Sequence, residues 1–287
     1  MMDEKLAIVT GADGGMGQVI TKAVASAGFT VIMACLNTAK AQPACERIRK
    51  ESGNERIEVR GVNLASMASV KAFADRLLDE KRPVGLLMNN AGILTTPVRR
   101  TEDGAETIVS VNYLAPFLLT RSLLPLMTAG SRIVNTVSCT YAIGKIDEAF
   151  FEKGRKGRFM RIPVYSNTKL ALLLFTRELA ERLKGSGITV NASDPGIVST
   201  NMIRMDMWFD RLTDIFYRPL IETPEEGAAT AVFLALSEEV AQKSGCCFAK
   251  SREKKITARV VNEASQSKLW KDTEAWFAAK NINFGQS

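Results

Sequence analysis

The stretch Leu6-Ala7-Ile8-Val9-Thr10-Gly11-Ala12-Asp13-Gly14-Gly15-Met16-Gly17 decides the fold. Its apolar residues predict a buried strand, and a helix is predicted after the glycines, over residues 16–27. Glycines permit a tight turn and a close approach of a pyrophosphate to the backbone, and a helix N-terminus favours negative charge. Because the glycines stand between a strand and a helix, the pattern predicts a dinucleotide-binding turn rather than an ordinary glycine-rich turn.

The rest of the chain continues to alternate between strands and helices. Strands are predicted over residues 29–34, 57–62, 84–88, 131–137 and 187–192, and helices over 38–52, 66–80, 101–127, 165–184 and 224–236. A short apolar piece at 246–249 is expected to end the regular structure, with a C-terminal tail over 250–287. This alternation predicts an α/β fold, a doubly wound (Rossmann) parallel sheet with both faces covered, in a single domain over 1–287. Its ligand is expected beyond the carboxyl ends of the strands, near the switch in strand order.

Composition excludes several classes of site. The 287 residues include no histidine, which removes histidine-based nucleophilic triads and most zinc sites, and no metal is expected. Five cysteines without Cys-x-x-Cys spacing indicate free thiols. The sequence has no apolar run of bilayer length and no signal-peptide pattern, so we expect a cytoplasmic protein without an integral membrane segment.

Net charge is +7, and basic residues gather at two places. One group lies at Lys153, Arg155, Lys156, Arg158 and Arg161, and the other within residues 250–255. No aromatic platform is interleaved with these charges, which favours a solvated loop over a nucleic-acid surface. We expect no nucleic-acid partner, although an anionic cofactor or lipid surface could also use the charge.

Tyr165-Ser166-Asn167-Thr168-Lys169 opens an apolar run, 170–183, that has helical period. Residues four apart share a helical face, so Tyr165 and Lys169 are expected to be neighbours. The pKa of a free phenol is about 10, and a nearby ammonium is expected to lower it. Such a tyrosine can exchange a proton with an alcohol or carbonyl oxygen, although the two residues could also merely share a helix.

The spacing of Thr10, Gly11, Gly15 and Gly17 resembles the short-chain dehydrogenase/reductase family, and the resemblance recurs in order along nearly the whole chain. The other matching positions are Asn63-Leu64, Asn89-Asn90-Ala91-Gly92, Asn112, Ser138, Tyr165 with Lys169, and Pro195-Gly196 with Val198 and Thr200. Residues 101–104, the long spacing from Ser138 to Tyr165 and Lys268-Leu269-Trp270 resemble the retinol dehydrogenase-like branch. That branch usually has Arg in place of Leu36 and Asp in place of Asn63.

This resemblance implies an oxidoreductase that transfers a hydride between a nicotinamide and a carbonyl or alcohol. Tyr165 would be the general acid in reduction and the general base in oxidation. Lys169 would lower the pKa of Tyr165 and bind the nicotinamide ribose, and Ser138 would hydrogen-bond the substrate oxygen. Asn112 would hold a water that links Lys169 to solvent. Ser138 could instead only end a strand, and Asn112 could only cap or bridge backbone.

The cofactor is expected to contact positions in all of the matching motifs. These are Gly11, Asp13, Gly15, Met16, Gly17, Leu36, Asn37, Asn63, Leu64, Asn90, Ala91, Gly92, Tyr165, Lys169, Pro195, Gly196, Val198 and Thr200. An NAD site needs an acid near the end of the second strand, and residues 34–37 offer none. NADP(H) is therefore favoured and NAD(H) is the alternative. Lys40 is the nearest cation for a 2′-phosphate, whereas Leu36 replaces the expected arginine and Asp13 would repel the phosphate.

Residues 201–221 follow the Pro195-Gly196 turn and are expected to form a helical lid over the substrate. Apolar residues recur there at three- and four-residue steps between Met205 and Phe216. Methionine and aromatic side chains suit bulky apolar ligands, so the expected substrate is a lipophilic ketone, aldehyde or secondary alcohol, as for a carbonyl reductase. Core packing or a dimer contact is the other interpretation of this stripe.

A second functional class stays open, because fold alone does not fix function. The chain could be a catalytically idle regulator that binds a nicotinamide cofactor. The sequence is less consistent with an epimerase or dehydratase, because those relatives have the loop pattern Gly-x-x-Gly-x-x-Gly and usually a larger C-terminal part, and this chain has neither. The family resemblance also implies a homodimer or homotetramer through the Tyr165 helix and the helix at 224–236, which the stretch before Tyr165 could block.

Overall fold

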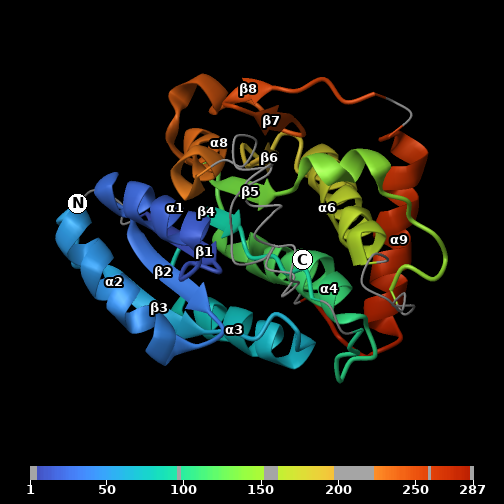
Figure 1. The fold of residues 1–287 in the computed structure, drawn as a ribbon, viewed down its shortest axis with the longest axis horizontal. Helices are drawn as coiled ribbons and strands as arrows, with labels where there is room; N and C mark the ends of the chain where they lie inside the picture. Colours follow the sequence, from blue (N-terminus) through green and yellow to red (C-terminus); the bar gives the residue numbers. More distant parts are fainter. Residues whose placement is uncertain (1–4, 96–97, 152–160, 197–222, 258–259, 285–287) are drawn as a thin grey trace, which may run out of the picture.

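The computed structural model describes residues 5–95, 98–151, 161–196, 223–257 and 260–284. Within these residues an eight-stranded sheet has the order β3-β2-β1-β4-β5-β6-β7-β8 (Figure 1). The strands are β1 Leu6–Thr10, β2 Thr30–Cys35, β3 Ile57–Gly61, β4 Val84–Asn89, β5 Arg132–Thr136, β6 Thr189–Asp194, β7 Cys247–Ala249 and β8 Arg252–Glu253. All pairs are parallel except β7 with β8. The predicted doubly wound sheet is confirmed, and its order reverses between β1 and β4, where such folds bind ligands.

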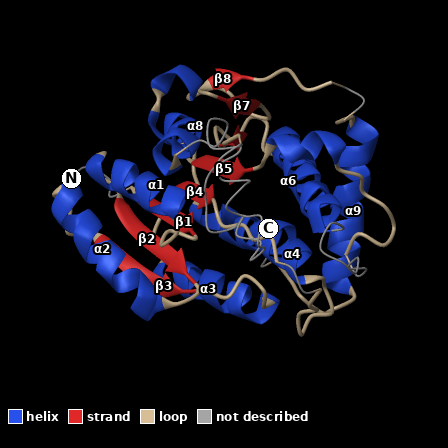
Figure 2. Ribbon diagram, in the orientation of Figure 1, coloured by secondary structure: helices blue, strands red, loops and turns tan. Residues whose placement is uncertain are grey.

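Helices cover both faces of the sheet (Figure 2). One face packs against α1 Gly15–Ser26, α2 Thr38–Ser52 and α8 Pro224–Leu236. The other packs against α3 Met67–Glu80, α5 Ala115–Leu123, α6 Arg161–Arg182 and α9 Glu263–Ala278. Alternate residues of β1 enter the two cores, Ala7 and Val9 on the α1 face and Leu6 and Ile8 on the α6 face. Burial on both faces explains why β1 is apolar without alternation.

The prediction that regular structure ends near residue 249 is wrong. Strand β8 and the sixteen-residue helix α9 follow, and α9 lies along α6 (Figure 1). Asn262 caps α9 through a reciprocal pair of hydrogen bonds with Ser265. Trp270 of α9 stacks on Phe175 of α6 with 5.8 Å between ring centroids. An oligomer built through α6 would therefore have to use a surface that α9 leaves uncovered.

The helix predicted over 101–127 begins later than expected, at Thr107. Gly104 has a φ of +83°, and Arg100 and Glu106 form an isolated antiparallel bridge, so residues 100–106 make a turn. Helix α4 Thr107–Val109 then passes through a π-helical turn, η1 Ser110–Leu114, into α5. Residues 107–126 have the length and hydropathy of a membrane span, but 83% of the apolar window is buried inside the protein, as in a core helix.

The assignment of Arg161 to a solvated basic loop is also wrong. Its side chain is 2% exposed at the start of α6 and forms an ion pair with Glu106. Arg161 Nε also donates a hydrogen bond to the Thr95 carbonyl at 2.8 Å. The remaining basic residues of that predicted loop, 153–158, lie outside the described residues.

Candidate active site

The β1–α1 turn has no room for side chains at its tightest points. Gly11 has a φ of +61°, a backbone conformation that favours glycine. A Cβ added to Gly17 would lie 2.1 Å from the Gly11 carbonyl oxygen, so helix α1 starts directly against the turn. Thr10 Oγ1 accepts hydrogen bonds from the amides of Asn90 and Ala91, both at 3.0 Å. These bonds join the turn to the end of β4 across the switch in strand order.

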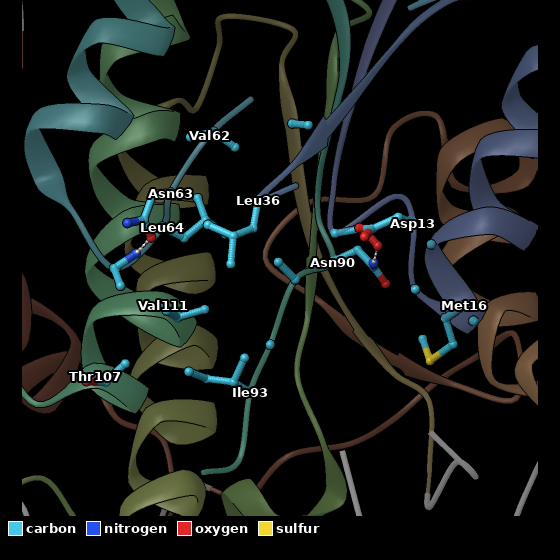
Figure 3. Close-up of a pocket in the computed structure, with 18 residues that line it drawn as sticks. Asp13, Met16, Leu36, Val62, Asn63, Leu64, Asn90, Ile93, Thr107 and Val111 are labelled. Atoms are coloured by element: carbon cyan, nitrogen blue, oxygen red, sulfur yellow. Dashed lines mark hydrogen bonds between the residues drawn. The ribbon is translucent and has the colours of Figure 1, made fainter. Parts of the chain in front are cut away.

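A cavity of about 460 Å³ opens at this point (Figure 3). The predicted cofactor residues that line it are Gly11, Asp13, Gly15, Met16, Gly17, Leu36, Asn63, Leu64, Asn90, Ala91 and Gly92. The lining residues that were not predicted are Gly14, Ala34, Val62, Ala65, Ile93, Thr107 and Val111, most of which adjoin the predicted motifs. Its volume suits a cofactor, and the turn that bounds it exposes backbone and a helix N-terminus, so the residues present fit the pyrophosphate of a dinucleotide.

Five predicted cofactor positions do not line this cavity: Asn37, Tyr165, Lys169, Pro195 and Gly196. Asn37 is the N-cap of α2, where its side chain accepts a hydrogen bond from the Lys40 amide at 3.0 Å, and it does not line the cavity. Asparagine is a favoured N-cap because its oxygen satisfies an otherwise free helix amide. Val198 and Thr200 lie outside the described residues, as does the whole predicted lid at 201–221.

Lys169 lies next to Gly92, which lines this cavity. Its side chain is 2% exposed, and its Nζ donates to the Thr136 carbonyl at the end of β5, at 2.8 Å. A Cβ built on Gly92, which lines the cavity, would be 3.4 Å from Lys169 Nζ and 3.6 Å from Asn112 Oδ1. Lys169 Nζ is 5.5 Å from the centroid of the Tyr165 ring. The structure thus brings Tyr165, Lys169 and Asn112 together beside the predicted cofactor loop.

The side chain of Asn112 bridges backbone. Its Oδ1 accepts from the Ile93 amide at 2.8 Å, and its Nδ2 donates to the Ile93 carbonyl at 3.0 Å and to Thr168 Oγ1 at 3.3 Å. It does so from the π-helical turn η1, a distortion often found at functional sites. The bridging role left open by the sequence is therefore present, and the water relay stays a prediction.

Ser138 lies two residues after the end of β5 and is 7% exposed. A hydrogen bond with Ser138 lowers the pKa of Tyr165, whereas burial of the phenol, the larger effect, raises that pKa to about 12. Burial lowers the pKa of Lys169 itself to about 8. The predicted lowering of the Tyr165 pKa by the Lys169 ammonium stays a prediction. The hydroxyl of Ser138 thus favours the phenolate of Tyr165.

Asp194, the last residue of β6, was not among the predicted site residues. Its Oδ1 accepts from the Gly196 amide at 3.1 Å, and its Oδ2 pairs with Lys254 Nζ at 3.0 Å. Asp194 is 3% exposed, and its charge raises the pKa of both Tyr165 and Lys169. Its place directly before Pro195-Gly196, at the carboxyl end of a predicted strand, was the available signal.

Comparison with known proteins gives consistent results. The family model described as short chain dehydrogenase matches residues 5–207. Human retinol dehydrogenase 12 is 36% identical over 268 residues, which cover 93% of this chain and 84% of that protein. Human retinol dehydrogenase 14 is 37% identical over 292 residues, with 96% and 86% coverage.

Solved structures extend the likeness to the fold. An uncharacterized protein from Mycobacterium Paratuberculosis has a TM-score of 0.77 at 27% identity, with 99% of this chain and 96% of that chain covered. A short chain dehydrogenase from Burkholderia cenocepacia in complex with NADP has a TM-score of 0.68 at 25% identity, with 86% and 96% covered. Because sequence and strand order agree over most of its length, the chain belongs to the short-chain dehydrogenase family of oxidoreductases, in the retinol dehydrogenase-like branch.

Proposed function

We propose that this oxidoreductase prefers NADP(H), acts on a lipophilic carbonyl or alcohol, and uses Tyr165 as its general acid and base. The observation that carries the proposal is the meeting of Tyr165, Ser138 and Lys169 beside Gly92, which lines the cavity bounded by the glycine turn. A bound nicotinamide would supply or accept the hydride. The protein must then exchange one proton with the substrate oxygen.

Tyr165 is suited to give that proton in the reductive direction. With a pKa of about 12, its phenol is protonated at neutral pH and can donate to a carbonyl oxygen as negative charge develops there. Ser138 lies beside the phenol, and its hydroxyl would donate a second hydrogen bond to the carbonyl oxygen of the substrate. In the oxidative direction Tyr165 must first lose its proton, so oxidation should accelerate toward alkaline pH.

The preference for NADP(H) rests on the end of β2. Residues 34–37 contain no carboxylate to accept from ribose hydroxyls, and Leu36 is 74% exposed where it lines the cavity. Asp13 opposes this preference, because its carboxylate lies near the end of β2 and would repel a 2′-phosphate. Burial is the main cause that raises the pKa of the Cys35 thiol, and the charge of Asp13 raises it further. The next basic residue along the sequence is Lys40, in the exposed first turn of α2.

The proposal of a lipophilic substrate draws on two apolar side chains near the acid/base group. Ile143 is 67% exposed in η3 Cys139–Ile143, the short helix that Ser138 caps, and Ile162 is 45% exposed one turn before Tyr165. Large exposed apolar side chains are a common feature of sites that bind apolar ligands, because the ligand covers them. Two similar proteins are retinol dehydrogenases, so a polyene aldehyde or alcohol is a suitable first substrate.

A substrate screen read by cofactor absorbance tests the proposal. Purified protein should be offered retinal, other lipophilic aldehydes and ketones, a sugar and a hydroxy acid, each with NADPH and with NADH. We expect the highest kcat/KM for a lipophilic carbonyl with NADPH. A higher value for the sugar or hydroxy acid would refute the substrate class. Tight cofactor binding without turnover of any compound would favour the idle regulator instead.

A further inference from the structure

The ion pair of Asp194 and Lys254 lies close enough to the candidate acid/base group to affect its charge. Asp194 ends β6, and Lys254 follows β8, with 3.0 Å between Asp194 Oδ2 and Lys254 Nζ. The Asp194 side chain is 2% exposed and that of Lys254 is 38% exposed, so the carboxylate is inside and its partner reaches it from the edge of the sheet. A carboxylate this deeply buried needs a cation or several hydrogen bonds to remain charged.

The turn of the β7–β8 hairpin sets the position of Lys254. Lys250 and Ser251, between the two strands, have φ values of 50° and 56°. Both residues are left-handed, as in the two-residue turn that joins tightly paired antiparallel strands, and neither is a glycine. The Lys254 amide then donates to the Cys247 carbonyl at 2.7 Å, which fixes Lys254 beside the end of β6.

The other oxygen of Asp194 holds the segment that continues toward the cofactor. Asp194 Oδ1 accepts a hydrogen bond from the Gly196 amide at 3.1 Å, so the ion pair of Asp194 and Lys254 is joined to the Pro195-Gly196 turn. Lys254 Nζ also lies 5.1 Å from the Tyr141 ring centroid and hydrogen-bonds its phenol. Tyr141 belongs to η3, the short helix that Ser138 caps. The ion pair thus contacts both segments that flank the candidate site.

We propose that Asp194 and Lys254 are positioning residues that together fix the Pro195-Gly196 turn and balance the electrostatic potential at Tyr165 and Lys169. The effect on catalysis rests on the proposed function, whereas the effect on the two side-chain charges does not. Asp194 favours the ammonium of Lys169 and disfavours the phenolate of Tyr165, and Lys254 offsets part of that negative charge. Among the residues that the structure describes, the other titratable groups that interact with Asp194 or Tyr165 are Cys139 and Tyr141 of η3 and Cys247 of β7.

Two opposite changes of charge separate this role from a structural one. Asp194→Asn keeps an oxygen that accepts from the Gly196 amide but removes the negative charge, so the pKa of Lys169 should fall by about one unit. Lys254→Met removes the compensating positive charge, so the pKa of Lys169 should rise. The double variant should return it close to the wild-type value, and Lys254→Arg, which keeps the charge, should leave it unchanged.

The measurement is carbon NMR of lysine labelled at Cε, in the cofactor-free protein, with the Lys169 signal assigned by its loss in Lys169→Arg. This titration does not depend on any substrate, so it stands even if the proposed function fails. As a second readout, the alkaline rise of alcohol oxidation should move to lower pH in Asp194→Asn and to higher pH in Lys254→Met. If both single variants shift the Lys169 titration in the same direction, or neither shifts it, the proposal is wrong. Should Asp194→Asn not fold, the comparison of Lys254→Met with Lys254→Arg still decides.

Discussion

Glu106→Gln should strongly destabilise the protein although it changes few atoms. Glu106 is 0% exposed and is the ion-pair partner of Arg161, which is 1% exposed. The amide oxygen of the variant would still accept from the Ile108 amide, which Glu106 Oε2 now does at 2.7 Å, so the helix cap survives. The variant loses the negative charge and the hydrogen bond that Glu106 Oε1 accepts from Arg161, because an amide nitrogen cannot accept, so Arg161 is left buried and uncompensated. Breaking a buried pair in this way costs about 3–5 kcal/mol.

The assay is urea unfolding, with the midpoint compared at constant slope. Glu58→Gln is the matched control, because its partners Arg60 and Arg82 are partly exposed, and surface pairs contribute about 1 kcal/mol or less. Adding Arg161→Met to Glu106→Gln should recover part of the loss, since no buried charge then remains. A Glu106→Gln protein as stable as the Glu58→Gln control would refute the reasoning that a buried charge is compensated here.

Further predictions concern the cofactor turn and the acid/base group. Gly17→Ala should abolish tight cofactor binding, measured by calorimetry, because its Cβ would lie 2.1 Å from a backbone oxygen; unchanged affinity would show that the turn can move. Asp13→Asn should raise NADPH affinity more than NADH affinity, and Leu36→Arg should do the same by adding a phosphate partner; titrations with both cofactors check this, and an equal change for the two would contradict it. Ser138→Ala removes the hydrogen bond that lowers the pKa of Tyr165, so the alkaline rise of alcohol oxidation should move to higher pH in its pH–rate profile; a shift to lower pH would be inconsistent with that bond.

The regular parts of this fold follow from local patterns. Apolar strands, polar turns and the capped helices at Thr38–Ser52 and Pro224–Leu236 were predicted within a few residues, because each carries its own signals. Helix α9 was missed because its apolar residues are spread among charges, and its stability comes from aromatic packing on α6 that no local pattern displays. Its cap at Asn262 was the one local signal.

Charges were the hardest features to predict from sequence. Arg161 stands at the end of a basic stretch, and only the fold reveals that Glu106, 55 residues away, is its partner. The effect of Lys169 on Tyr165 was predicted from helical spacing, which gives proximity but not burial, and burial decides the pKa of both groups. The order of motifs in the sequence predicted the residues of the cavity and of the acid/base group. The contact between Asp194 and Lys254 could not be predicted in this way, because it depends on the pairing of β6 with β7.

Tyr165→Phe gives the most direct test of the central claim, that Tyr165 exchanges the proton with the substrate oxygen. The variant keeps the aromatic ring beside Lys169 and loses only the hydroxyl. The account predicts a cofactor dissociation constant close to that of the wild type, together with a fall in kcat of about 100-fold or more for a lipophilic carbonyl. A variant that binds cofactor normally and keeps most of the wild-type kcat would contradict it.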